Sequence, residues 1–212
     1  SALDAFKKGD LIIVTDDADR ENEGDLFILA EKATTEKVAF MVRHTTGILC
    51  VAMTQDRARH LRLPLMVEEN QDSKKTAFTV SVDYKVALTT GVSATERANT
   101  ARALADGSAA HSDFIRPGHV FPLIADKGGL RARRGHTEAG VALAQIVGAE
   151  PLTLLSEIVN EDGSMARGQS LIDFATKHSI HMVSIQELID IAPVAQEVHS
   201  DYEFVWANLP LH

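Results

Sequence analysis

The fold that we expect is decided by residues 11–29, which read LIIVTDDADRENEGDLFIL. Two apolar runs, at residues 11–14 and 26–29, enclose a segment crowded with carboxylates. Short runs of aliphatic and aromatic residues are typical of strands, and they fall far below the roughly 20 residues that span a bilayer. The stretch therefore predicts two strands joined by an acidic loop.

Outward from this stretch, strand-like runs and helical patterns alternate along the chain. Further strands are predicted at residues 48–53, 77–82, 120–124 and 152–159, and helices at 36–44, 94–104, 138–147 and 170–178. Two helix starts carry capping boxes, Ser93 with Glu96 and Ser184 with Glu187. No internal repeat or linker divides the sequence. We expect a single α/β (α+β) domain over residues 1–192, with a large mixed sheet flanked by helices.

The last segment, residues 193–212, has a different composition. Tyr202, Phe204 and Trp206 alternate with other residues there, which is typical of a strand or arm docked on a surface. A frayed chain end is an equally good interpretation.

Composition and charge narrow the function class. The chain has 212 residues, 45% hydrophobic and 24% charged, which are ordinary globular values. Its net charge of −9 argues against a nucleic-acid partner, although local arginines can still attract a small anion. The single cysteine, Cys50, allows no intramolecular disulfide and fits a reducing compartment. With no leader and no apolar span in view, we expect a soluble, cytoplasmic protein without a membrane partner.

The acidic loop has two possible interpretations. It holds six carboxylates within residues 16–25, and in an extended backbone Glu21, Glu23 and Asp25 would project to one side. Carboxylates gathered in this way suit a hard divalent cation such as Mg²⁺. The alternative is a solvated hairpin loop, which most acidic loops are. Arg20 within the loop either neutralises the acids or reaches for an anionic ligand.

A second charged loop covers residues 128–139 and reads GGLRARRGHTEA. Arginines beside the N-terminus of a helix, together with its free amide groups, form a natural seat for a phosphate. His136 at the helix start could bind a metal or act as a base. The alternative is a basic surface turn in which Thr137 is a simple helix cap.

Three further residues are candidates for chemistry. His119 lies in a turn that enters a predicted strand. Glu157 is an acid inside an apolar strand, which is costly to bury unless the carboxylate is paired or functional, although strand alternation could also expose it. Cys50 is read first as a small buried hydrophobic residue.

At these motifs the sequence resembles 3,4-dihydroxy-2-butanone 4-phosphate synthase, a lyase family of riboflavin biosynthesis. The resemblance runs from about residue 5 to residue 191 and rests on segments 17–25, 76–80, 91–94, 116–122, 133–139 and 156–157. It implies conversion of D-ribulose 5-phosphate into formate and 3,4-dihydroxy-2-butanone 4-phosphate. It also implies Mg²⁺ or Mn²⁺ as cofactor, two ions per site with substrate bound, and a homodimer with sites near the subunit interface.

The resemblance assigns roles to residues of this chain. Glu21 and His136 are implied as metal ligands, and the implied catalytic residues are His119, Glu157, Asp25, Glu23 and Cys50. The implied substrate contacts are Arg20, Glu21, Asp25, Arg133, Arg134, Gly135, His136 and Thr137.

The sequence departs from the family pattern at two places, and two other functions are possible alternatives. Ser156 stands where many members have a cysteine, and segment 68–75 matches the pattern poorly, which puts closure of that loop over substrate in question. A metal-dependent sugar-phosphate isomerase or aldolase would share the first proton abstraction, and a non-catalytic module could bind a phosphorylated ligand. Neither alternative explains the additional acid–base candidates His119 and Glu157.

Overall fold

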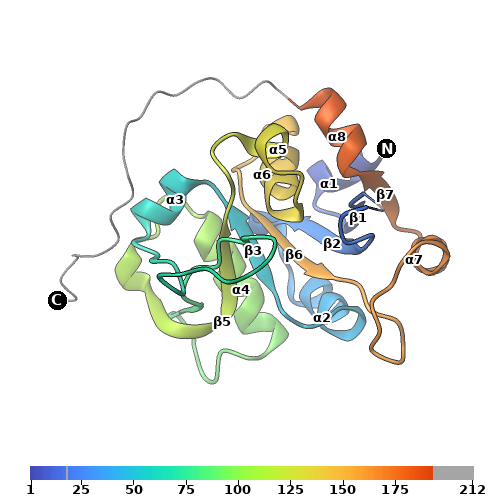
Figure 1. The fold of residues 1–212 in the computed structure, drawn as a ribbon. Helices are drawn as coiled ribbons and strands as arrows, with labels where there is room; N and C mark the ends of the chain where they lie inside the picture. The colour runs from blue at the N-terminus through green and yellow to red at the C-terminus, as the bar shows by residue number, and fades with distance from the viewer. Residues whose placement is uncertain (18, 193–212) are drawn as a thin grey trace.

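The structure, a computed structural model, describes residues 1–17 and 19–192 (Figure 1). Its centre is a seven-stranded sheet in the order β4-β5-β3-β6-β2-β1-β7. The strands are β1 (Ile12–Thr15), β2 (Gly24–Leu29), β3 (Cys50–Met53), β4 (Val82–Tyr84), β5 (Phe114–Ile124), β6 (Thr153–Glu157) and β7 (His181–Ser184). The sheet is mixed: β1 pairs parallel with β7 and β3 with β5, whereas the other neighbouring pairs are antiparallel.

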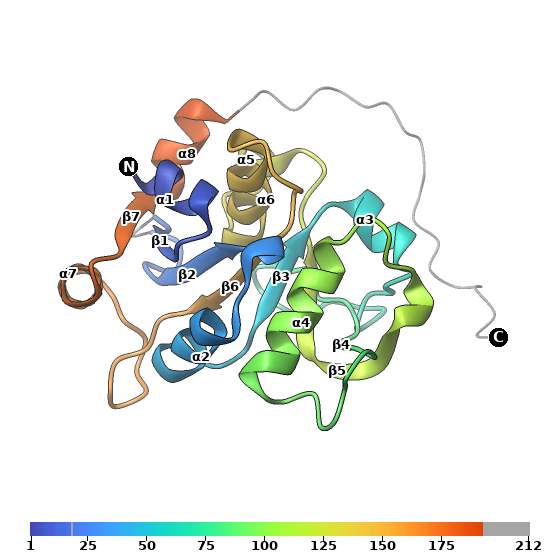
Figure 2. The same ribbon diagram turned by 180° about the vertical axis from the view of Figure 1, so that it is seen from behind.

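Helices cover both faces of the sheet. They are α1 (Ala2–Lys8), α2 (Thr35–His44), α3 (Gln55–His60), α4 (Ala94–Ala105), α5 (Gly129–Ala132), α6 (His136–Ile146), α7 (Gln169–His178) and α8 (Ile185–Ile191). Two short 3₁₀ turns, η1 (Ala30–Lys32) and η2 (His111–Asp113), complete the set of described elements. The core on one face includes buried residues of α2 and α4, and the core on the other includes residues of α1, α6 and α8 (Figure 2).

The alternation of side chains explains why the runs that predicted β1 and β2 are apolar throughout. Ile13, Leu26 and Ile28 point into the core beneath α2 and α4. Phe27 and Leu29 point to the opposite face, toward α6 and α1. A strand buried on both sides has no need for polar residues, so it reads as a continuous apolar run. The expected α/β fold with a large mixed sheet is confirmed.

The predicted elements are observed with one exception, and the structure also contains elements that were not predicted, among them α1, α3, α5 and β7. The strand predicted at 77–82 is wrong, because Phe78 and Thr79 form only isolated bridges and the regular strand in this region is β4. The sequence did not predict strand β7, because its polar ends, His181 and Ser184, leave only two apolar residues between them. Both predicted capping boxes are present, at the starts of α4 and α8. The expectation for segment 193–212 lies outside the described residues.

The structure also bears on the question of a membrane. Among the described residues, no helix is long and apolar enough to cross one.

Candidate active site

A cavity opens where β2 and β3 begin and β6 ends, on the face of the sheet that α6 covers. Acidic and basic groups face each other across it, and a few apolar side chains form its floor. The cavity is lined by Arg20, Glu21, Glu23, Asp25, Cys50, Asp72, Lys74, Thr76, Phe78, Leu123, Arg133, His136, Thr137, Leu155, Ser156 and Glu157. The acidic and basic loops, far apart in the sequence, therefore meet in one site.

Pairing between β2 and β6 brings together two of the predicted acids. Asp25 is directly opposite Glu157 in the register of these antiparallel strands, so both side chains lie on the same face. Asp25 is 2% exposed, and its Oδ1 has no hydrogen-bond partner among the described residues. Burial, followed by the charges of Glu157 and Glu21, raises the pKa of Asp25 well above its usual range. Asp25 is therefore suited to hold a proton, and the Glu157 side chain lies beside it.

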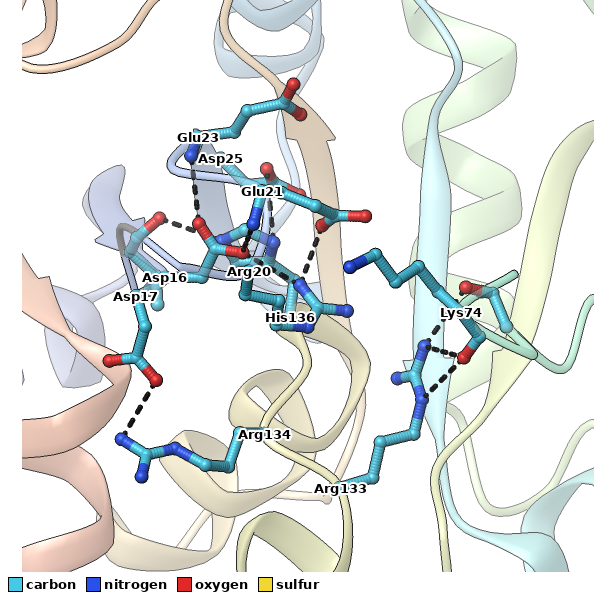
Figure 3. A network of polar contacts seen from close by, with 12 residues as sticks. Asp16, Asp17, Arg20, Glu21, Glu23, Asp25, Lys74, Arg133, Arg134 and His136 are labelled. Atoms are coloured by element: carbon cyan, nitrogen blue, oxygen red, sulfur yellow. Dashed lines mark hydrogen bonds and ion pairs between the residues drawn. The ribbon is translucent and has the colours of Figure 1, made fainter. Parts of the chain in front are cut away.

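The acidic loop is organised around Asp16 (Figure 3). Asp16 Oδ1 accepts a hydrogen bond from the backbone N–H of Glu23 at 2.8 Å. Its Oδ2 accepts from the backbone N–H of Glu21 at 3.1 Å and from Arg20 Nη1 at 2.9 Å. Arg20 Nη1 also contacts Glu21 Oε2 at 2.6 Å. The segment is a hairpin loop in which Glu21, Glu23 and Asp25 line the cavity, whereas Asp19 is exposed.

His136, at the start of α6, lies against this loop. Ligand atoms of His136, Glu21 and Asp16 all lie within 4.8 Å of one another. His136 Nε2 is 3.2 Å from the carbonyl oxygen of Val14, and Nδ1 is 3.6 Å from Asp25 Oδ1. Burial lowers the pKa of His136 to about 4, so its imidazole is neutral at neutral pH.

This donor set fits a divalent cation. Two carboxylates and one neutral imidazole supply lone pairs, and the buried Asp25 Oδ1 beside them has no hydrogen-bond partner among the described residues. The predicted pair Glu21 and His136 is thus brought together. The sequence did not reveal that Asp16 joins them, because nothing in its loop distinguishes it from five other carboxylates.

Arg133 lines the cavity on the side opposite the acidic loop, where several hydrogen bonds fix its guanidinium. Its Nη1 donates to the buried Glu138 Oε2 at 2.6 Å, and its Nη2 donates to Thr76 Oγ1 at 3.0 Å. Nε and Nη2 also donate to the backbone carbonyl of Lys74 at 3.3 and 3.2 Å (Figure 3). A side chain at Gly135, the N-cap of α6, would collide with Arg133 and Glu138. Glycine at this position lets the guanidinium lie close to the helix start.

Other residues of the basic loop divide between the cavity and the outside. Thr137, in the first turn of α6, lines the cavity. Arg134 does not line it and turns toward the outer side of the acidic loop (Figure 3). Its guanidinium pairs with Asp17 at 2.9 Å and donates to Gln186 Oε1 at 2.6 Å. The structure therefore places Arg134 as a brace between the acidic loop and α8.

His119 lies apart from the cavity that contains Glu157. It does not line that cavity, and its side chain is 45% exposed. Asp83 on β4 holds it twice: Oδ1 accepts from the His119 backbone N–H at 2.8 Å, and Oδ2 is 2.7 Å from the ring Nδ1. Cys50, in contrast, does line the cavity, where burial raises the pKa of its thiol.

Segment 68–75, which departs from the family pattern, contributes two residues that the sequence did not suggest. Asp72 and Lys74 line the cavity next to Thr76, and the side chain of Lys74 extends toward the acidic loop (Figure 3). Hydrogen bonds within the segment, such as Thr76 N–H to Asp72 Oδ2 at 2.9 Å, give it a defined shape. The polar composition of this segment is typical of an ordinary surface loop. Its position beside the cavity is visible only in the folded structure.

The arrangement can perform acid–base chemistry on a small anion. It combines a neutral acid, a carboxylate, a set of cation ligands and a helix N-terminus next to an arginine. Groups of opposite protonation preference within one cavity are typical of enzymes that move protons.

Comparison with known proteins gives consistent matches. A sequence model of the family described as 3,4-dihydroxy-2-butanone 4-phosphate synthase matches residues 1–191. Riboflavin biosynthesis protein RibBA of Bacillus subtilis (strain 168) is 53% identical over 188 residues, which are 89% of this chain and 47% of that protein. The 3,4-dihydroxy-2-butanone 4-phosphate synthase of Tolumonas auensis is 49% identical over 189 residues, 89% of this chain and 87% of that protein.

A solved structure agrees with these matches. It is a 3,4-dihydroxy-2-butanone 4-phosphate synthase in complex with two magnesium ions, and it superposes with a TM-score of 0.86 at 46% identity. The superposition covers 89% of this chain and 93% of that chain. The chain thus matches the shorter synthase over most of its length but spans about half the length of the RibBA relatives.

Proposed function

The chain belongs to the 3,4-dihydroxy-2-butanone 4-phosphate synthase family, and from that premise we propose that it converts D-ribulose 5-phosphate into 3,4-dihydroxy-2-butanone 4-phosphate and formate. The observation that carries the proposal is the pairing of a proton-holding Asp25 with Glu157 beside the Asp16, Glu21 and His136 cluster. In this role the protein is a lyase of riboflavin biosynthesis.

Glu21 and His136 would hold the divalent cation, Mg²⁺ or Mn²⁺, with Asp16 fixing the loop that carries Glu21. Two ions per site with substrate bound is our expectation, in keeping with the two magnesium ions of the matching structure. When bound, a divalent cation stabilises negative charge that develops on substrate oxygens during proton removal. A carboxylate and a neutral imidazole leave positions on such an ion for those oxygens.

The chain's own residues would move the protons. The Glu157 carboxylate accepts a proton from the substrate, and Asp25, held protonated by its surroundings, supplies one to a departing hydroxyl group. Glu23 at the rim and Cys50 on the floor shape the space around these groups. The apolar side chains of Phe78, Leu123 and Leu155, which also line the cavity, would keep water from the reacting carbons.

The phosphate group of the substrate would be bound at the start of α6. Free N–H groups of the first turn, beginning at Gly135, and the hydroxyl of Thr137 face an anion there, with the charge of Arg133 beside them. Arg20, held by Asp16 and Glu21, adds a cation from the opposite loop. Arg134 supports this site indirectly through its contact with Asp17. Binding energy from the phosphate can then orient the reacting end of the sugar.

We propose a homodimer in which His119 serves the site of the second subunit. The support is that His119 is exposed and lies outside the cavity, although the family resemblance implies a catalytic role for it. Static light scattering should therefore give twice the 23.0 kDa mass of one chain at micromolar concentration. A monomer mass with full activity would contradict the shared site. A His119→Asn chain mixed with a Glu157→Gln chain should recover activity that neither variant has alone.

The decisive experiment follows the carbon that leaves. D-ribulose 5-phosphate labelled with ¹³C at C4 should give labelled formate by NMR and an unlabelled four-carbon phosphate. An isomerase or aldolase would give no formate, and a non-catalytic module would leave the substrate unchanged. Either result would overturn the proposed reaction. Because sugar phosphates are metabolites of the cell interior, we propose that the protein acts in the cytoplasm.

A further inference from the structure

Thr46, on the segment that follows α2, contacts the side chain of Glu157 without lining the cavity. Its hydroxyl oxygen is 2.7 Å from Glu157 Oε2, and its backbone N–H donates to the Glu157 carbonyl at 2.9 Å. Thr46 thus forms hydrogen bonds with both the main chain and the carboxylate of Glu157. Glu157 Oε1 has no hydrogen bond within the described part of the chain, so it is the oxygen left for the substrate.

The neighbouring hydrogen bonds fix the direction of the Thr46 proton. The Ile48 N–H donates to Thr46 Oγ1 at 3.3 Å, so one lone pair of that oxygen is used. Ser156 Oγ, 3.4 Å away, donates its own proton to the Ile48 carbonyl at 2.9 Å. An ionised carboxylate accepts only, so the Thr46 hydroxyl donates to the closer and stronger acceptor, Glu157.

The segment that carries Thr46 is itself held from three sides. Thr45 Oγ1 donates to the Met41 carbonyl at the end of α2, at 2.7 Å, and Thr45 bridges to Ile158 beyond β6. The buried Arg97 of α4 donates to the Gly47 carbonyl at 3.2 Å. The position of Thr46 is therefore set by the fold, and its hydroxyl meets Glu157 without any adjustment of the cavity.

We propose that Thr46 is a positioning residue for the reaction, which holds Glu157 Oε2 so that Oε1 is aimed at the substrate. This inference rests on the proposed function, since it needs Glu157 to exchange a proton with the substrate. A carboxylate that rotates freely spends only part of its time in the reactive orientation, so loss of the hydroxyl lowers the rate of the chemical step. Substrate binding is left alone, because Thr46 does not face the cavity.

The test compares steady-state formate release by the wild type, Thr46→Val and Thr46→Ser. Thr46→Val keeps the shape and should lower kcat about tenfold while KM changes less than about twofold, the pattern of an interaction that acts in the transition state. Thr46→Ser, which restores the hydroxyl, should recover kcat to within about twofold of the wild type. The matched control Thr176→Val removes an exposed hydroxyl on α7, whose one hydrogen bond within the described residues goes to the Ile172 carbonyl, and should match the wild type.

A second comparison separates positioning from a structural effect. Glu157→Asp shortens the side chain by one methylene, so its carboxylate no longer meets the hydroxyl. Thr46→Val should then add little to the loss caused by Glu157→Asp alone, because the two changes remove one shared contact. Unaltered kcat in Thr46→Val, additive losses in the double variant, or no recovery with serine would each overturn the inference. A wild type that releases no formate would overturn the proposed function, and this inference with it.

Discussion

Chelation of divalent cations is expected to abolish formate release, and added Mg²⁺ or Mn²⁺ is expected to restore it. The reason lies in the charge distribution of the cavity. Asp16, Glu21 and His136 present ligand atoms within 4.8 Å of one another, and the neighbouring Asp25 Oδ1 is buried without a partner among the described residues. Arg20 offsets part of the negative charge of Asp16 and Glu21, and a divalent cation held by the three ligand atoms would offset the rest.

Variants of the ligands sharpen this prediction. Glu21→Gln and His136→Ala should each lose activity by about a hundredfold or more, since even indirect supports of a metal site are worth 10–100-fold. Isothermal titration calorimetry should show that both variants bind Mn²⁺ more weakly than the wild type does. This measurement is independent of turnover. Asp19→Asn is the matched control, because Asp19 belongs to the same loop but is exposed and does not line the cavity. Full turnover in excess EDTA would refute the metal site.

Replacement of Glu157 by Gln is expected to reduce formate release by roughly 10²–10⁴-fold, the usual worth of a positioned acid or base. The substitution keeps the shape of the side chain, and the backbone pairing with Asp25 is unaffected. Glutamine can still receive the Thr46 hydrogen bond through its carbonyl oxygen, so the loss reports the missing ionisable group.

Three measurements make this prediction specific. Circular dichroism should show an unchanged fold, and Mn²⁺ affinity should stay near that of the wild type because Glu157 does not belong to the ligand cluster. Glu161→Gln, on the exposed turn that follows β6, is the control for a lost carboxylate and should keep wild-type activity. Formate release by Glu157→Gln at the wild-type rate would show that the acid–base role belongs to another residue.

The sequence predicted the layers of the fold better than the contacts of the site. Continuous apolar runs revealed strands buried on both sides, and the capping boxes at Ser93 and Ser184 marked two helix starts correctly. These signals are local, so each can be read within a few residues. The strand expected at 77–82 fails for the same reason, since an apolar run shows extended backbone but not whether a neighbouring strand pairs with it.

The site depends on pairings that are not local. Only the register of β2 with β6 sets Asp25 against Glu157, and only the packing of α6 brings His136 to the acidic loop. The sequence treated Arg133 and Arg134 alike as phosphate ligands, yet their side chains diverge, one toward the cavity and the other toward α8. Adjacent residues at a turn can face opposite ways, and composition does not record which way each faces.

The attachment of Arg133 to the segment before Thr76 has a consequence for mutational tolerance. Arg133 holds this segment partly through the backbone carbonyl of Lys74, an acceptor that every amino acid supplies. A different side chain at position 74 therefore leaves the hydrogen bonds from Arg133 to this carbonyl in place. Thr76 and Glu138 bind the guanidinium independently. Position 74 can thus accept side chains that adapt the cavity to a different substrate, whereas Arg133 itself is the residue that such an adaptation has to preserve.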